Sequence, residues 1–187
     1  MPELKVLLSR ETIAKRVAEM GAEIERDFRG QSIIFVGVLK GAAIFLSDLA
    51  RNVSLDATFD FIGVSSYGNR PIAKDDPAGH AAWDSLGEVR LTKDLDQSLA
   101  GRNVLLVEDI LDTGLTLNYL VRTFELRKPR SVAAVTLLDR PYRRLVDDLP
   151  VEYVGFVVPD ELFVGFGFDL EEKWRHLPDL HLLRLEV

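Results

Sequence analysis

The sequence predicts an α/β fold in which a central parallel sheet is flanked by helices. Residues 32–38 form a continuous apolar run, typical of a strand buried on both faces, and a turn and an apolar-periodic segment at 42–51 follow it. The same succession recurs at residues 104–107 and 117–126. A third buried strand is predicted at residues 131–138. Strands that alternate with helices in this way indicate one α/β domain over residues 1–187.

Composition limits the class of protein. With 187 residues, 47% of them hydrophobic and 28% charged, the chain is long enough for one globular domain with a sizeable core. It has no cysteine, and no apolar run approaches the roughly 20 residues needed to cross a bilayer. The first residues lack the apolar core of a secretory signal, so a cytoplasmic location is expected, with no membrane partner. The net charge of −7 argues against broad nucleic-acid binding.

The remaining elements are predicted from periodicity and turn residues. Ser9 is placed to cap a helix over residues 10–27, whose apolar residues recur at helical spacing. Further strands are expected at 55–65, 88–92, 151–158 and 181–185. Residues 69–87 are polar, rich in turn formers and without periodicity, which favours a flexible lid. The alternative is a disordered insertion without function, and it fits residues 73–82 better than Ser66 and Tyr67.

The turn at residues 112–116 carries the chemistry. It follows the buried strand 104–107 and an acidic pair, Glu108 and Asp109. Ligands of open parallel sheets bind beyond the carboxyl ends of the strands. Gly114 allows the backbone to approach an oxyanion, and the start of the following helix offers N–H donors, so the turn suits a phosphate monoester. The two carboxylates suit ribose hydroxyls or hydrated Mg²⁺. Alternatively, the acids merely face water, and Asp112 or Thr113 is a helix N-cap.

Lys40 and Gly41 occupy a second turn at a strand end. A cation there can face the same ligand, although a plain surface lysine is the alternative. His80, His176 and His181 show no metal-ligand spacing.

Residues 104–116 resemble the 5-phosphoribosyl-1-pyrophosphate (PRPP) motif of the type I phosphoribosyltransferases. That motif consists of an apolar strand, two acids, two apolar residues and the sequence Asp-Thr-Gly-x-Thr. Other segments extend the similarity over most of residues 30–185, and they resemble the hypoxanthine-guanine branch of that family. These segments are 38–41, 65–67, 137–141, 158–161, 164–169 and Arg175. The resemblance implies a type I phosphoribosyltransferase-like sheet with a small hood and a flexible lid. It also implies a homodimer or homotetramer.

Family members transfer the 5-phosphoribosyl group from PRPP to a ring nitrogen of a 6-oxopurine, release pyrophosphate and require Mg²⁺. By resemblance, Asp112 is the catalytic proton acceptor. The implied PRPP and phosphate ligands are Glu108, Asp109, Asp112, Thr113, Gly114, Leu115, Thr116, Lys40, Gly41, Ser66, Tyr67 and Arg175. The implied base ligands are Arg140, Leu162, Phe163 (through its carbonyl) and Asp169. The implied metal ligands are Glu108, Asp109 and Asp169.

Two positions depart from the family pattern. Arg140 stands where the family usually has a lysine that binds the 6-oxo group, and arginine is longer, planar and forked. Leu162 stands where an aromatic residue normally stacks on the purine. The lost stack would weaken base binding by on the order of 0.5–1.5 kcal/mol. The reaction type is therefore better determined than the identity of the base.

Three alternatives remain open at this point. Arg140 and Leu162 are compatible with a phosphoribosyltransferase for another base, such as xanthine. A nucleotide-sensing, RNA-binding regulator on the same fold would need a basic face, which the acidic composition disfavours. A PRPP sensor without catalysis is the third, and the intact Asp112 argues against it.

Overall fold

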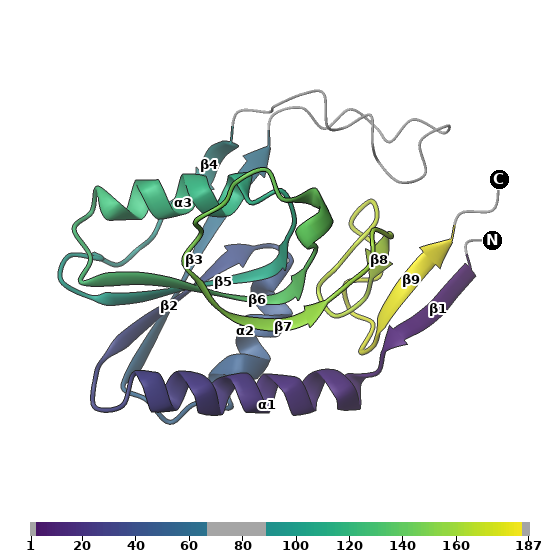
Figure 1. Ribbon diagram of the computed structural model, residues 1–187, viewed down its shortest axis with the longest axis horizontal. Helices are drawn as coiled ribbons and strands as arrows, with labels where there is room; N and C mark the ends of the chain where they lie inside the picture. Colours follow the sequence, from purple (N-terminus) through teal and green to yellow (C-terminus); the bar gives the residue numbers. More distant parts are fainter. Residues whose placement is uncertain (1–2, 67–88, 185–187) are drawn as a thin grey trace.

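Residues 3–66 and 89–184 are described by the computed structural model, and they form two β-sheets and three α-helices (Figure 1). The helices are α1 (Arg10–Asp27), α2 (Ala42–Ala50) and α3 (Leu115–Glu125), and a short 3-10 helix, η2, spans Pro141–Arg143. The strands of the larger sheet are β2 (Ile33–Leu39), β3 (Ala57–Ser66), β4 (Val89–Lys93), β5 (Asn103–Leu111), β6 (Ser131–Asp139) and β7 (Val151–Val157).

The larger sheet has the strand order β4-β3-β2-β5-β6-β7, and every pair in it is parallel except β3 with β4. The helix that follows β2 and the helix that follows β5 lie on opposite faces of this sheet (Figure 1). The chain therefore leaves the neighbouring strands β2 and β5 in opposite directions. This is a topological switch point, where open α/β sheets bind ligands beyond the carboxyl ends of the strands.

Alternation along the central strands produces the two hydrophobic layers. On β2, Ile33 and Phe35 pack in one cluster with the buried sides of α1 and α2. The residues between and beyond them, Ile34 and Val36, pack in a second cluster with α3. Successive side chains of a strand point to opposite faces, so an unbroken apolar run becomes a strand covered on both sides. The predicted α/β class is confirmed.

A smaller antiparallel sheet forms the predicted hood. Its strand order is β1 (Glu3–Leu8), β9 (Leu180–Arg184) and β8 (Phe163–Val164). The strand β1 was not predicted, because its partner lies at the far end of the chain. Phe163, Phe166 and Phe168 of the hood region belong to the same hydrophobic cluster as the buried residues of α1 and α2. The hood therefore shares the core of the larger sheet.

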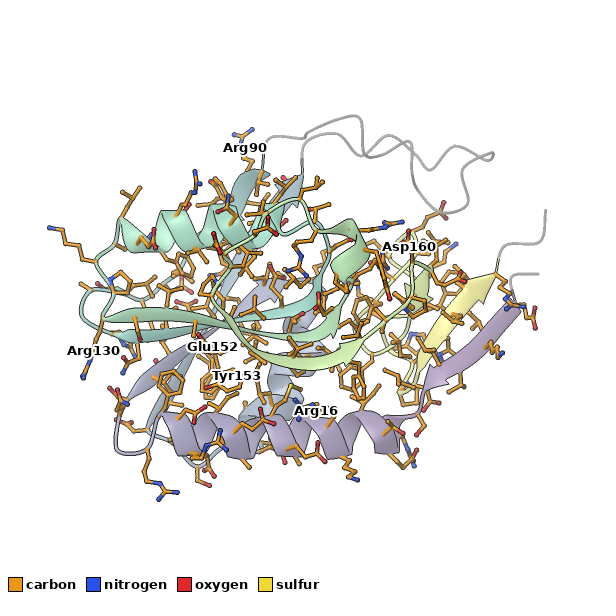
Figure 2. All side chains as sticks on the ribbon, in the orientation of Figure 1. Arg16, Arg90, Arg130, Glu152, Tyr153 and Asp160 are labelled. Atoms are coloured by element: carbon orange, nitrogen blue, oxygen red, sulfur yellow. The ribbon has the colours of Figure 1, made fainter. Side chains whose placement is uncertain are left out.

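Helix α1 also holds the edge strand β7 through polar contacts. Arg16 donates to the carbonyl oxygens of Val154 at 2.8 Å and Gly155 at 3.3 Å. The hydroxyl of Tyr153 donates to Asp27 at 3.0 Å. Figure 2 shows Arg16 and Tyr153 between the helix and this strand. These contacts attach the edge strand to the helix, and the guanidinium of Arg16 occupies two strand carbonyls that another strand could otherwise bind.

The predicted elements are found with shifted ends. Strand β5 continues to Leu111, so Glu108 and Asp109 lie inside its last residues, where Glu108 pairs with Thr136 of β6. Helix α3 begins at Leu115, earlier than predicted, and β4 is the predicted returning strand. Tyr67 and the predicted lid, 69–87, lie outside the described residues. Among the helices of the described part of the chain, none has the length and apolar character needed to cross a membrane.

Candidate functional site

A pocket of about 340 Å³ opens at the switch point, beyond the carboxyl ends of β2 and β5. Most of the predicted PRPP and metal ligands line it, together with Val38, Leu39, Val64, Ile110, Leu111 and Leu117. These ligands are Lys40, Gly41, Glu108, Asp109, Asp112, Thr113, Gly114, Thr116, Asp169 and Arg175. The fold thus brings together residues from four distant parts of the chain.

The acidic pair lines this pocket. Glu108 is buried, and burial together with the neighbouring Asp109 raises its pKa well above the ordinary value. Burial raises the pKa of Asp109 to about 6, although the Ile110 N–H, which donates to its Oδ1 at 2.8 Å, acts in the opposite direction. Two carboxylates held away from water favour a cation or hydroxyl donors beside them.

The turn after β5 is shaped by Gly114, whose φ of 83° lies in the left-handed region. A Cβ at this position would also lie 2.8 Å from Leu149 Cδ1. Gly114 is itself the residue before α3, and no side chain caps the helix, so the predicted alternative of Asp112 or Thr113 as N-cap is wrong. The hydroxyl of Thr113 accepts from the Leu115 N–H at 3.3 Å. Gly114, Thr113 and the first turn of α3 therefore present donors toward the pocket.

The second turn is packed against the acidic pair. The peptide bond between Leu39 and Lys40 is cis. A Cβ on Gly41 would lie 1.5 Å from Asp109 Oδ2, so only glycine lets the carboxylate and this backbone meet. On the other side, a Cβ on Gly167 would lie 2.2 Å from the Gly41 carbonyl oxygen. Two close approaches therefore fix this turn between β5 and the hood.

Arg175 and Lys40 supply positive charge at the rim. Arg175 pairs with Asp169 at 2.7 Å and donates to the Gly167 carbonyl at 2.7 Å. The carboxylate of Glu172 lies 3.0 Å from Lys40 Nζ and 3.3 Å from Arg175 Nη2. Glu172, which was not predicted, thus bridges the two cations. Glu172 has a φ of 63°, and such left-handed backbone in a non-glycine residue is often found at functional sites.

Asp112 joins the pocket to a second cluster of charges. Its Oδ2 lies 3.4 Å from Arg140 Nη1 and 3.6 Å from Arg143 Nη1. Both arginines also face Asp160 Oδ1, at 3.6 Å and 2.6 Å respectively. Burial raises the pKa of Asp112, and the two guanidinium groups oppose that shift. A carboxylate with a raised pKa inside a cleft suits a proton acceptor.

Two buried polar atoms of this cluster have no hydrogen-bond partner within residues 3–66 and 89–184. They are Asp112 Oδ1, an acceptor, and Arg140 Nε, a donor. Buried polar groups are nearly always paired, so an unpaired one calls for an explanation, such as a ligand. The predicted base ligand Arg140 is deeply buried and donates through Nη2 to the Glu161 carbonyl at 2.9 Å. This cluster therefore offers a ligand one hydrogen-bond acceptor, Asp112 Oδ1, and one donor, Arg140 Nε.

The other predicted residues are placed differently. Leu115 does not line the pocket, but its N–H donates to the Thr113 hydroxyl within the turn. Leu162 is half-buried, and its carbonyl accepts from the Leu183 N–H at 2.9 Å. Phe163 is buried beneath Arg140. Ser66 ends β3, while Tyr67 lies outside the described residues.

Arg143 and Arg144 were missed as site residues. Arg144 Nε donates to the Asp112 carbonyl at 3.2 Å, and its Nη2 bonds the carboxylate of Asp139. The signal was present in the sequence, because two arginines follow a strand end within five residues.

The predicted metal ligands partly fit Mg²⁺. Glu108, Asp109 and Asp169 line one pocket, but no group of three acidic or histidine side chains in the described parts of the chain could alone hold a metal. Mg²⁺ is usually bound by one or two carboxylates, with water and substrate phosphates completing the shell. The donor set therefore fits a metal that arrives with a phosphorylated substrate.

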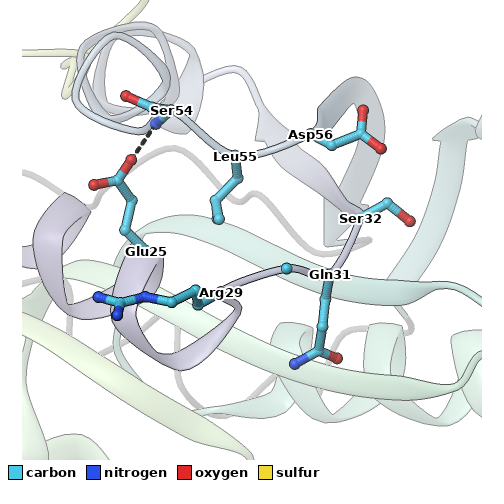
Figure 3. A pocket seen from close by; sticks show the side chains of 8 residues that line it. Glu25, Arg29, Gln31, Ser32, Ser54, Leu55 and Asp56 are labelled. Carbon is cyan, nitrogen blue, oxygen red and sulfur yellow. Dashed lines mark hydrogen bonds between the residues drawn. The ribbon is translucent and has the colours of Figure 1, made fainter.

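A second cavity, of about 500 Å³, lies at the opposite edge of the sheet, near the starts of β2 and β3 (Figure 3). Its lining includes Glu25, which accepts from the Ser54 N–H at 2.5 Å, together with Arg29, Gln31 and Asp56. It is remote from the strand ends that carry the acidic pair. Its larger volume therefore does not make it the site of the chemistry.

The fold and the strand-end pocket define a phosphoribosyltransferase-type protein, and sequence comparison agrees. The phosphoribosyl transferase domain model matches residues 4–171. The chain therefore belongs to the phosphoribosyl transferase family.

Its relatives identify the branch more closely. The hypoxanthine-guanine phosphoribosyltransferase of Bacillus subtilis is 44% identical over 98% of this chain and 94% of that protein. A crystal structure of a hypoxanthine-guanine phosphoribosyltransferase from Bacillus anthracis superposes with a TM-score of 0.84 at 41% identity, covering 99% of this chain and all of that one. A hypoxanthine phosphoribosyltransferase mutant from Trypanosoma cruzi, complexed with the product IMP, gives a TM-score of 0.83 at 33% identity over 96% of this chain and 84% of that one.

Proposed function

We propose that the protein transfers the 5-phosphoribosyl group of PRPP to a ring nitrogen of a 6-oxopurine, hypoxanthine or guanine, in purine salvage. The products are the nucleoside monophosphate and pyrophosphate. One observation carries the proposal: Asp112 is shared between the phosphate pocket and the buried Arg140 cluster. A sugar phosphate on one side and a heterocycle on the other would meet at this carboxylate. The relatives' names support the choice of base.

The pocket residues divide naturally among the parts of PRPP. Thr113, Gly114 and Thr116, with the start of α3, would hold the 5-phosphate, because amide donors and a helix N-terminus favour an anion. Lys40 and Arg175 would face the pyrophosphate, together with the Gly41 backbone. The remaining acceptors, Glu108 and Asp109, would bind the ribose hydroxyls.

The reaction needs stabilisation of a departing anion. The sugar carbon gains positive character as pyrophosphate leaves, and Lys40 and Arg175 would stabilise the charge on the leaving group. Mg²⁺, held by Asp109 or Glu108 and by Asp169 with substrate oxygens, would add Lewis-acid neutralisation of that charge. Asp112 would accept the proton from the imidazole edge of the base as the new bond forms.

The base half of the site supports a ring with a carbonyl beside an N–H. Arg140 is a permanent donor, and its unpaired Nε suits a carbonyl oxygen. Asp112 Oδ1 is an unpaired acceptor and suits a ring N–H. A 6-oxopurine offers both groups on one edge. Adenine has an amino group in place of the 6-oxo group. This amino group and the Arg140 guanidinium are both donors, so adenine would bind poorly.

Location and assembly are proposed on the family resemblance. We infer a cytoplasmic enzyme that forms a homodimer or homotetramer from single-domain subunits. The shared core of hood and sheet supports a single domain. Sedimentation of the purified protein would give the mass of the assembly, and a monomer at all concentrations would exclude the inferred oligomer.

The direct test of the proposed function is product formation. Purified protein, PRPP, Mg²⁺ and hypoxanthine should give equal amounts of IMP and pyrophosphate. Leaving out the base should abolish most pyrophosphate release, and a chelator should stop the reaction, because the metal arrives with PRPP. Hydrolysis of PRPP without any nucleotide product would contradict the proposal.

A further inference from the structure

Arg140 lies over an aromatic ring of the hood. Its guanidinium carbon is 5.1 Å from the centre of the Phe163 ring. The arginine follows β6 of the larger sheet, whereas Phe163 begins β8 of the hood. The two residues are 6% and 7% exposed, so the contact is shielded from water. An arginine over a ring in a desolvated place is held more strongly than one at the surface.

We propose that Phe163 is a positioning residue that, through its ring, holds the Arg140 guanidinium in the plane required to read the carbonyl of the base. The inference rests on the proposed function, and it goes beyond it by giving the Phe163 side chain a role in base selectivity. A long arginine side chain has many rotamers, and a fixed ring selects the few that lie flat on its face.

The orientation of the guanidinium plane matters because the hydrogen-bond donors of Arg140 lie along its edge. Nη2 is engaged by the Glu161 carbonyl, and Nη1 faces Asp112 and Asp160. Only Nε remains without a partner in the described part of the chain. Because the nitrogens of a guanidinium lie in one plane, fixing that plane also fixes the direction in which the free donor points. A tilted guanidinium would lose the alignment of its donor with a carbonyl oxygen.

Phe163 is itself rigidly placed. Its backbone is paired with Leu182 of β9, and its ring packs edge-on against Phe168, with the ring centres 6.5 Å apart at 70°. Both rings belong to the main hydrophobic cluster. A ring fixed on two sides can transmit a fixed position to the arginine above it. Phe168 packs against the Phe163 ring, whereas Arg140 lies over Phe163, so Phe168 provides a matched control.

The test is a double-mutant cycle with a base-selectivity readout. The proteins are wild type, Phe163→Met, Arg140→Lys and the double variant, with Phe168→Met as control. Methionine fills a similar volume without a ring. The kcat and the KM for hypoxanthine, adenine and PRPP are measured for each protein with Mg²⁺ present. Wild-type activity with hypoxanthine is checked first, since its absence would refute the proposed function rather than this inference.

We expect Phe163→Met to lower kcat/KM for hypoxanthine on the order of tenfold, mainly through the KM of the base. The KM for PRPP should stay within about twofold, and selectivity over adenine should fall. In the Arg140→Lys background the effect of Phe163→Met should shrink to about twofold or less, because residues that act as a unit are not additive. Phe168→Met should lower thermal stability but leave base selectivity unchanged.

Three results would overturn the inference. They are unchanged base KM in Phe163→Met, an equal effect of that substitution in both backgrounds, and an equal loss of selectivity in Phe168→Met. A second readout needs no change at Phe163. The Nε–H resonance of Arg140, assigned by its loss in Arg140→Lys, should show an upfield ring-current shift and should move when hypoxanthine is added. A resonance at the ordinary position of a free arginine would also overturn the inference.

Discussion

Asp112 connects the two halves of the site through different atoms. Its carboxylate faces Arg140 and Arg143, while its carbonyl accepts from Arg144. The backbone of this residue is thus fixed independently of its charge. Removing the charge should therefore change the chemistry more than the shape of the PRPP pocket.

Asp112→Asn should reduce turnover on the order of a hundredfold or more, because a general base contributes about that much. PRPP should still bind, since the turn that follows is unchanged. Calorimetry gives the PRPP affinity, and pyrophosphate release gives the turnover. Asp139→Asn is the matched control, because Asp139 bonds Arg144 and lies at the neighbouring strand end. Equal turnover in Asp112→Asn and wild type would exclude Asp112 as the proton acceptor.

Glu172 competes with a bound anion for the same two cations. Its carboxylate contacts Lys40 and Arg175, the residues assigned to pyrophosphate. Glu172→Gln should therefore tighten product inhibition by pyrophosphate by a few fold, the scale of an exposed ion pair. The inhibition constant for pyrophosphate against PRPP measures the effect, and added salt should diminish it.

Glu171→Gln is the control for that prediction. Glu171 is the neighbouring acid, is more exposed and lies 4.0 Å from Lys173 rather than near the two site cations. A general change in surface charge would move both variants alike. If the two variants gave the same inhibition constant, Glu172 would have no particular role at the pyrophosphate site.

At the scale of elements, the strand, turn and helix around residues 103–125 could be predicted well. The apolar run determined β5, and Gly114 marked the left-handed position in the turn between this strand and the helix. The strand ends were less predictable, because β5 is lengthened by its pairing with β6. The strand that causes this lengthening, β6, lies outside residues 103–125.

Contacts between distant elements could not be predicted. Strand β1 exists because it pairs with β9, more than 170 residues away, and its own residues carry no strong strand signal. The bridging of Lys40 and Arg175 by Glu172 depends on the path of the hood loop. The stack of Arg140 on Phe163 also joins two sheets. The sequence showed Arg140 and Leu162 as two separate departures from the family pattern. In the structure, Arg140 instead contacts Phe163, the residue that follows Leu162.

Gly114→Ala tests the turn as an element. The substitution forces a side chain into left-handed backbone and brings Cβ to within 2.8 Å of Leu149 Cδ1. We expect a loss of about 1–2 kcal/mol in the free energy of unfolding and a raised KM for PRPP, because the 5-phosphate donors move. Chemical denaturation and steady-state kinetics measure the two effects.

Gly101→Ala is the control for the turn. Gly101 has a φ of 71° but nothing within 4 Å of the added Cβ, and it does not line the pocket. Gly101→Ala should therefore lower the free energy of unfolding only through its strained backbone, and it should keep the wild-type KM for PRPP. A raised KM in both variants would show that the effect comes from stability and not from the turn.

At the scale of the whole molecule, the site exists because two sheets meet at a switch point. The larger sheet supplies the phosphate turn and the acids, and the hood supplies Asp169, Arg175 and the ring beneath Arg140. The close approach of Gly167 to Gly41 joins the two parts at the rim. Binding of the base and binding of pyrophosphate should therefore both depend on contacts between the two sheets.

The measurement that tests this account most directly is pyrophosphate release from PRPP and Mg²⁺ with hypoxanthine, guanine, xanthine and adenine in parallel. The unpaired donor of Arg140 and acceptor of Asp112 predict release with hypoxanthine or guanine and little with adenine. Release with only xanthine or adenine would contradict the proposed reading of the base. PRPP binding without release for any base would contradict the assigned reaction.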